Sequence, residues 1–147
     1  MKNLFLILLF ILVALPAAGQ ELTVQVANNI KYGKTEKLEK LIAAERINEC
    51  VGVVDSKKYN YLAISIKLKS MKSLQFFVEK GANIEGVCAD KTPLMYAAKY
   101  GQLEMVKYLI ENGANLTATY KGRTAYYYAR HFNHSEIRKY LKELRSH

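Results

Sequence analysis

The chain has 147 residues, half of them hydrophobic, which is enough for one modest domain and too few for two. Its 22 Lys and Arg against 13 Asp and Glu give a formal net charge of +9, which favours acidic or anionic partners over basic ones. Its two cysteines, Cys50 and Cys88, are too few and too far apart for a zinc cluster, so we expect no structural metal and no cofactor.

The first segment has the pattern of a signal peptide. Lys2 gives a positive start, Leu4 to Leu15 is an unbroken apolar run, and Pro16 to Gly19 offers small residues at the cleavage position. An uncleaved membrane anchor is the alternative, but it would need roughly 20 apolar residues. We therefore expect residues 1–19 to be removed and residues 20–147 to form a domain that is exported to the periplasm or secreted.

After this segment the chain repeats itself at a spacing of 32 residues. Gly81-Ala82-Asn83 recurs as Gly113-Ala114-Asn115, and Thr92 aligns with Thr124 at the same spacing. A degenerate first copy aligns at an offset of 68, which is two periods plus a short insertion. The sequence therefore predicts four copies of one structural unit, with approximate bounds 21–55, 56–88, 89–120 and 121–147.

Each copy has the pattern of two short helices. In the third copy Thr92 can cap a helix that starts at Pro93, because proline fits the first helical position. Gly101 permits the turn into a second helix, where the apolar residues from Leu103 to Ile110 form one stripe. Gly113 then ends that helix in a left-handed conformation. One copy cannot bury its stripe alone, so we expect the copies to stack.

The first and last copies carry mixed charge on their second helices, within Lys34 to Lys40 and Arg138 to Arg145. The terminal units of a stack have only one neighbour and need a polar outer face. We therefore interpret both segments as solvated caps and not as nucleic-acid-binding arms, and we expect no nucleic acid partner.

The third copy allows a family to be named. Its segments Thr92 to Ala98, Gly101 to Leu109 and Asn112 to Asn115 closely resemble the ankyrin-repeat consensus. The resemblance implies an all-α solenoid of about four helix-turn-helix repeats with short β-hairpin-like fingers. It also implies a module that binds a protein and does no chemistry.

The resemblance further implies that a partner binds on the concave side, formed by the fingers and the exposed side of each first helix. Those positions carry bases beside apolar or aromatic residues and no acid, so we expect an acidic protein partner. The alternative is that the pattern only reflects the abundance of Lys and Tyr. The predicted partner-binding residues are Lys31, Tyr32, Lys57, Tyr59, Lys67, Leu68, Lys91, Lys99, Tyr100, Tyr120, Lys121, Arg123, His131 and Phe132.

The cysteines fall in neighbouring fingers, Cys50 after the first copy and Cys88 after the second. In an oxidising compartment such a pair is expected to be bonded. The extra residues from Val51 to Asp55 leave the relative placement of the fingers undefined, and a disulfide needs Cα atoms within about 7 Å. A disulfide and two independent thiols therefore both remain open.

We do not expect an enzyme. The histidines are His131, His134 and His147, and they have no cysteine or paired carboxylate nearby. Zinc sites generally use three or four protein ligands, so His131 and His134 do not predict a metal site. The sequence also has no nucleophile elbow, P-loop or dinucleotide-binding fingerprint.

The leading functional hypothesis is a monomeric module that binds an acidic protein in the periplasm or outside the cell. The resemblance allows an immunity-type partner of an exported effector. The alternative is a binder of anionic envelope lipid or polymer, in which the excess positive charge contacts the envelope surface. A scaffold inside the cell is disfavoured by the signal-peptide pattern.

Overall fold

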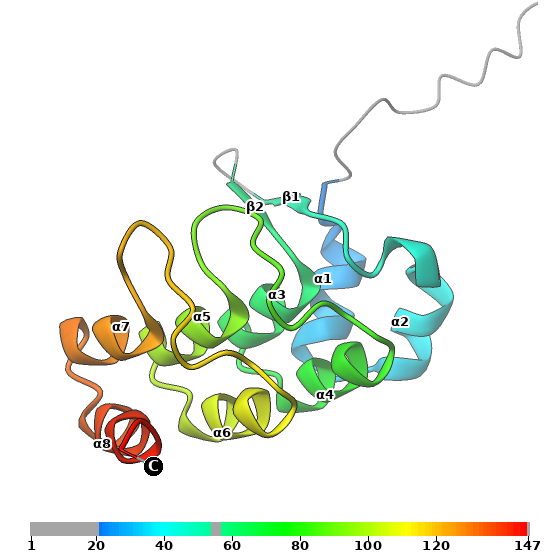
Figure 1. The fold of residues 1–147 in the computed structure, drawn as a ribbon. Coiled ribbons are helices and arrows are strands. Elements are labelled where there is room, and N and C mark those ends of the chain that lie inside the picture. The colour runs from blue at the N-terminus through cyan, green and yellow to red at the C-terminus, as the bar shows by residue number, and fades with distance from the viewer. Residues whose placement is uncertain (1–20, 54–56, 147) are drawn as a thin grey trace, which may run out of the picture.

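A computed structural model describes residues 21–53 and 57–146, in which eight α-helices form four pairs (Figure 1). The predicted signal peptide lies outside the described residues. The elements are α1 (Val24–Lys31), α2 (Thr35–Leu41), the 3-10 helix η1 (Ala44–Arg46), β1 (Val51–Val53), β2 (Lys57–Tyr59), α3 (Tyr61–Lys67), α4 (Met71–Glu79), α5 (Pro93–Lys99), α6 (Leu103–Glu111), α7 (Ala125–His131) and α8 (Ser135–Leu144).

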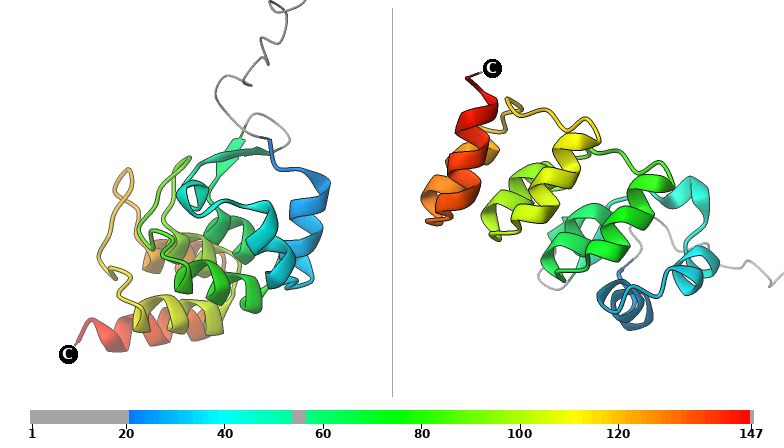
Figure 2. Two further views of the ribbon diagram at one scale, coloured as in Figure 1. Left: turned by 90° about the vertical axis from the view of Figure 1, so that its right-hand side faces the viewer. Right: turned by 90° about the horizontal axis from the view of Figure 1, so that it is seen from below.

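The helices lie in two rows. The inner helices α1, α3, α5 and α7 lie next to the fingers, which are the connections from one outer helix to the next inner helix (Figure 1). The outer helices are α2, α4, α6 and α8, and the last three of them lie nearly parallel (Figure 2). Each inner helix packs on its neighbour and on its own outer helix. This arrangement confirms the predicted all-α solenoid of helix-turn-helix units.

The inner helices begin where the sequence predicts caps. The Thr92 side chain accepts a hydrogen bond from the backbone N–H of Met95, and Pro93 follows at the first helical position. Thr124 makes the same contact to Tyr127 one period later. A cap and its partner are three residues apart, so the local sequence is enough to predict these helix starts.

The turn between α5 and α6 confirms the predicted role of Gly101. Its φ is +70°, a left-handed conformation that glycine adopts readily. The equivalent residues Lys69 and Asn133 also have positive φ, so the turn alone does not require glycine. A Cβ on Gly101 would lie 2.7 Å from Cε1 of His134, and Nε2 of that ring is 2.9 Å from the Lys99 carbonyl oxygen. Packing of the histidine ring is therefore what excludes a side chain here.

The core runs between the two rows through all four pairs. Val106 and Leu109 of α6 have no exposed surface, as their spacing predicts. Leu103 and Ile110, from the same predicted stripe, are partly buried against this core. Ala97 of α5 is fully buried, since a small side chain lets neighbouring helices approach closely.

The first finger differs from the others because it contains the strands. Strand β1 pairs with β2 in antiparallel register, with Val51 opposite Tyr59. Among the described residues the last finger has a single bridge, between Tyr120 and Arg123. The hairpin-like fingers therefore include a paired ladder only where the insertion lengthens the first one.

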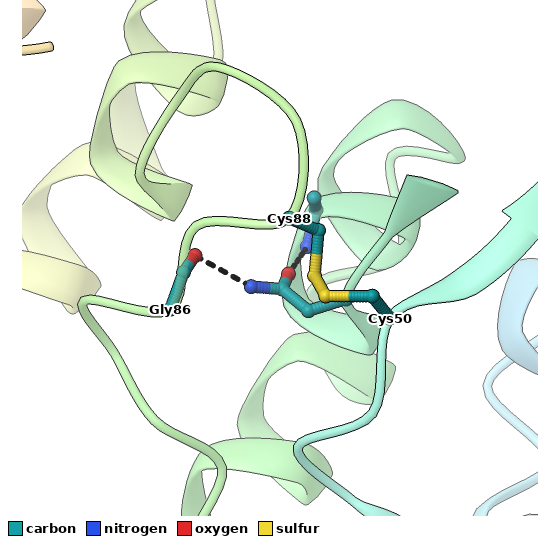
Figure 3. The surroundings of a disulfide bond; sticks show 5 residues. Cys50, Gly86 and Cys88 are labelled. Atoms are coloured by element: carbon teal, nitrogen blue, oxygen red, sulfur yellow. Dashed lines mark hydrogen bonds between the residues drawn. A yellow bond between two sulfur atoms is a disulfide. The ribbon is translucent and has the colours of Figure 1, made fainter. Parts of the chain in front are cut away.

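The structure joins Cys50 and Cys88 in a disulfide (Figure 3). Their Cα atoms are 5.5 Å apart, within the limit of about 7 Å that a disulfide requires. The bond ties the first finger to the second across a sequence separation of 38. Of the two alternatives that the sequence leaves open, the structure therefore has the disulfide.

A second contact between the same fingers runs through Asn60. Its Oδ1 accepts the N–H of Ala63 at 2.8 Å and so caps α3, while its Nδ2 donates to the Gly86 carbonyl at 2.7 Å. Gly86 lies beside the disulfide (Figure 3). At the matching cap positions Thr92 and Thr124 have no second donor of this kind. Asparagine therefore caps the helix and also bridges two fingers.

We expect Asn60→Thr to lower the free energy of unfolding by about 1 kcal/mol, because it keeps the cap and removes the bridge. Asn60→Ala removes both and is expected to cost about 2 kcal/mol. Urea unfolding followed by circular dichroism measures the difference. Thr92→Ala serves as the control, since it removes a cap with no bridge. Equal stabilities of Asn60→Thr and the wild type would contradict the bridging role.

Candidate partner-binding surface

Among the eight helices, acidic side chains occur only on the outer row. The inner helices contain no Asp or Glu in any of their four sequences. Each outer helix contains at least one glutamate. Bases stand at the last residue of each inner helix or directly before it, and positive charge at a helix C-terminus is worth about 0.3–1 kcal/mol. Helix stabilisation therefore accounts for the bases. Burial accounts for the missing acids in α3 and α5, where every residue but the last is buried, whereas α1 and α7 lack acids although they have exposed positions.

Aromatic rings accompany these bases. The ammonium of Lys67 lies 4.0 Å from the ring centroid of Tyr59, which joins α3 to the first finger. The ammonium of Lys99 lies 5.5 Å from the Tyr100 ring and 5.4 Å from the Phe132 ring, so it spans the third and fourth helix pairs. Such contacts hold a cation near the surface without neutralising it.

Two predicted contact residues, Tyr59 and Lys91, are buried, and their prediction as surface residues is wrong. Tyr59 is 8% exposed because its ring packs edge-on against Tyr96 of the next inner helix, at 5.6 Å between centroids. Lys91 is also 8% exposed because its ammonium packs over the rings of Tyr96 and Tyr128, at 5.5 and 5.2 Å. Both residues support the surface from beneath.

The other predicted residues reach the surface to different degrees, and Tyr32 is the most exposed large apolar side chain among them at 64%. Arg123 stands over the ring of Tyr127 at 5.5 Å, and Lys121 lies 5.7 Å from the Tyr120 ring. Exposed residues are Lys31, Tyr32, Lys57, Lys121, Arg123, His131 and Phe132, and partly buried residues are Lys67, Leu68, Lys99, Tyr100 and Tyr120.

Lys31 and Tyr32 form a separate group at the N-terminal end. The Tyr32 ring lies 5.4 Å from the Lys31 ammonium and 5.9 Å from that of Lys34. Within residues 21–53 and 57–146, no cation–aromatic contact links this group to Lys67 or Lys99. Ring contacts thus connect the second helix pair to the third through Tyr59 and Tyr96, and the third to the fourth through Lys99 and Phe132. In the described residues no such contact reaches the first pair.

Asp90 is a residue of this surface that the sequence did not single out. Its carboxylate forms an ion pair with Lys91 and accepts a hydrogen bond from the Tyr96 hydroxyl at 3.4 Å. Burial acts to raise the pKa of Asp90, but the hydrogen bond and the charge of Lys91 outweigh it, so the pKa lies below its usual value. The carboxylate is therefore ionised near neutral pH. Its position directly before Lys91 in the sequence is the one feature that could have indicated this ion pair.

Lys99 has the opposite environment. Burial lowers the pKa of its ammonium, and the positive charges of Lys91 and Lys67 lower it further. Asp90 offsets that effect only in part. In the described part of the chain Lys99 has no ion pair. The centre of the surface is therefore a site of unbalanced positive charge.

Two features that would indicate another kind of site are absent from residues 21–53 and 57–146. No three His, Cys, Asp or Glu side chains in these ranges come together as metal ligands do. None of the helices in the same ranges has the length and hydropathy to cross a bilayer.

Comparison with known proteins agrees with the helix pairs. A family model described as ankyrin repeats (3 copies) matches residues 62–146, which is more than half of the chain. The match spans the helix pairs from α3 to α8, and the first pair lies outside it. No curated protein matches the sequence.

Proposed function

Because this chain belongs to the ankyrin-repeat family, whose members are protein-interaction modules, we propose that it binds an acidic protein through its inner helices and fingers. The row of bases at the C-terminal ends of the four inner helices, with no carboxylate on any of these helices, carries the proposal. Opposite charges across an interface speed association and select the partner. A surface with bases and no acids on its helices suits an acidic protein.

The aromatic residues favour a protein over an anionic polymer or lipid surface. Tyr32, Tyr100 and Phe132 offer rings that a partner can cover, and buried aromatic side chains supply much of the affinity of protein interfaces. A polyanion would bind through the lysine and arginine charges alone and would not need the rings. Binding that disappears at moderate ionic strength, and that survives replacement of all three rings by alanine, would favour the envelope polymer instead.

We place this activity in the periplasm or outside the cell. The signal-peptide pattern of residues 1–19 motivates this location, and the disulfide supports it because such bonds persist in oxidising compartments. A function as an immunity-type partner of an exported effector fits the same location. Affinity capture from an envelope extract, followed by mass spectrometry, identifies the partner.

The double charge reversal Lys67→Glu with Lys99→Glu is expected to slow association with the captured protein by about tenfold at low salt. The thermal midpoint is expected to fall by only a few degrees, because each reversal removes a C-terminal cation worth about 0.3–1 kcal/mol. Lys99→Glu relieves repulsion from Lys91, which offsets the lost contact between Lys67 and the Tyr59 ring. Stopped-flow or surface-based kinetics measure the rate.

The matched control is Lys40→Glu with Lys139→Glu. Both residues are exposed on outer helices, and the change in net charge is the same as in the test variant. The control is expected to associate at nearly the wild-type rate. If both double variants slow association equally, net charge alone guides the partner and the inner-helix surface is not the interface.

A further inference from the structure

The repeat spacing places a cation where the preceding repeat has an aromatic ring. Tyr59 and Lys91 are 32 residues apart and stand directly before the caps of α3 and α5. Lys67 and Lys99, also 32 apart, are the last residues of the same helices. In the second repeat Lys67 therefore faces a tyrosine, at 4.0 Å. In the third repeat the Lys91 ammonium lies 5.5 Å from the Tyr96 ring, which stacks on Tyr100 at 6.3 Å between centroids, and the Lys99 ammonium lies 5.5 Å from the Tyr100 ring.

This like-charge pair is costly where it stands. Lys91 is almost fully buried, and burying an ammonium is unfavourable unless a partner compensates it. The carboxylate of Asp90 provides that compensation, while Lys99 is left without an ion pair in the described residues. The two ammonium groups therefore flank one pair of stacked rings, and in the described residues Lys91 has an ion-paired carboxylate while Lys99 has none. Burial lowers the pKa of Lys99, and the charge of Lys91 lowers it further.

We propose, resting on the proposed function, that Lys99, with Lys91 on the other side of the stacked Tyr96 and Tyr100 rings, forms a binding site for one carboxylate of the acidic partner. Asp90 indicates which anion the group accepts, because a carboxylate already lies between the Lys91 ammonium and the Tyr96 hydroxyl. A second carboxylate beside Lys99 would give each of the two ammonium groups an anionic neighbour.

The surroundings of Lys99 define the residue that fits. The rings of Tyr100 and Phe132 lie 5.5 and 5.4 Å from its ammonium, and Phe132 is 41% exposed. A charged hydrogen bond becomes stronger when apolar groups exclude water around it. The site therefore fits an Asp or Glu side chain followed by an apolar or aromatic residue that covers Phe132.

The test uses the full chain with its disulfide intact and two capped dipeptides, acetyl-Glu-Phe-amide and acetyl-Gln-Phe-amide. Lysine ε-CH2 signals are followed by NMR in the chain labelled with 13C-lysine, at low salt. The glutamate peptide is expected to shift the Lys99 signal and to raise the pKa of Lys99, because a bound carboxylate stabilises the charged ammonium. The glutamine peptide is expected to leave both unchanged.

Three variants separate the site from general attraction. Lys99→Gln is expected to lower the affinity for the glutamate peptide about tenfold, which corresponds to the loss of one hydrogen bond to a charged group. Lys139→Gln, at an exposed position on the outer helix α8, is expected to leave the affinity unchanged. Asp90→Asn is expected to tighten binding, because the internal carboxylate no longer neutralises Lys91. Circular dichroism verifies that each variant is folded.

The proposal is overturned if the glutamate peptide does not shift the Lys99 signal, or if Lys139→Gln weakens peptide binding as much as Lys99→Gln does. It is also overturned if inorganic phosphate binds Lys99 as tightly as the peptide, because the site would then accept any anion. Suppose that a captured protein depends on Lys67 and Lys99 for its association, but the glutamate peptide does not bind at Lys99. That result refutes the carboxylate site and leaves the proposed function standing. If the peptide binds at Lys99 but no protein partner is captured, the proposed function is refuted instead.

Discussion

Replacing Leu109 with alanine is expected to lower the free energy of unfolding by about 2 to 5 kcal/mol. Leu109 is fully buried on α6, which packs against both α5 and α8. The substitution opens a cavity between these helices, and the remaining side chains can close it only in part. A domain of this size is stable by about 5–15 kcal/mol, so this one change removes a large share of its stability.

Urea unfolding followed by circular dichroism measures the loss for Leu109→Ala. Ile110→Ala is the matched control, because it removes a comparable side chain from the same helix at a partly buried position. The control is expected to cost about half as much or less, since less apolar surface returns to water. Equal losses for the two variants would show that α6 does not pack through the Leu109 face.

Removing the disulfide by Cys50→Ser with Cys88→Ser is expected to cost about 4 kcal/mol. The bond closes a loop with a sequence separation of 38, and its loss restores the conformational entropy of that loop to the unfolded chain. The first helix pair depends on this link, because Asn29 and Ile30 on α1 and Leu38 on α2 are the buried residues of these two helices. Later helix pairs bury more apolar surface of their own.

Urea unfolding with and without a reductant tests this prediction. The wild type is expected to lose stability when reduced, whereas the double serine variant should not respond to the reductant. Thiol titration of the unfolded, non-reduced wild type is expected to detect no free thiol. Amide hydrogen exchange should become faster first in α1 and α2. Two free thiols, or equal unfolding midpoints in both conditions, would contradict the stabilising role of the bond.

The sequence by itself determined the helix pairs, because the rules that place them act over a few residues. The Thr92 cap and Pro93 lie within one turn of the helix they start, and Gly101 acts on its own φ. The 32-residue period then predicts the same helix starts and turns in the neighbouring repeats. The stacking of the units followed, since no unit can bury its apolar stripe alone.

The candidate surface was only partly predictable. The bases and rings of the inner helices follow from the same period, and the structure places most of them on the surface. The spacing did not reveal that Tyr59 and Lys91 are buried, because the rings of Tyr96 and Tyr128 that cover them belong in part to the next repeat. The repeat spacing also did not identify Asp90 as the counter-ion of the Lys91 ammonium.

Only the tertiary structure decided the contacts between repeats. The disulfide, the bridge from Asn60 to Gly86 and the contact of the Lys99 ammonium with the Phe132 ring each depend on how far neighbouring fingers and helices lie from one another in space. That separation is set by side-chain packing across the stack, between residues dozens of positions apart along the chain. Local propensity and periodicity predict where helices and turns lie along the sequence, but they do not predict the distances in space between side chains of different repeats.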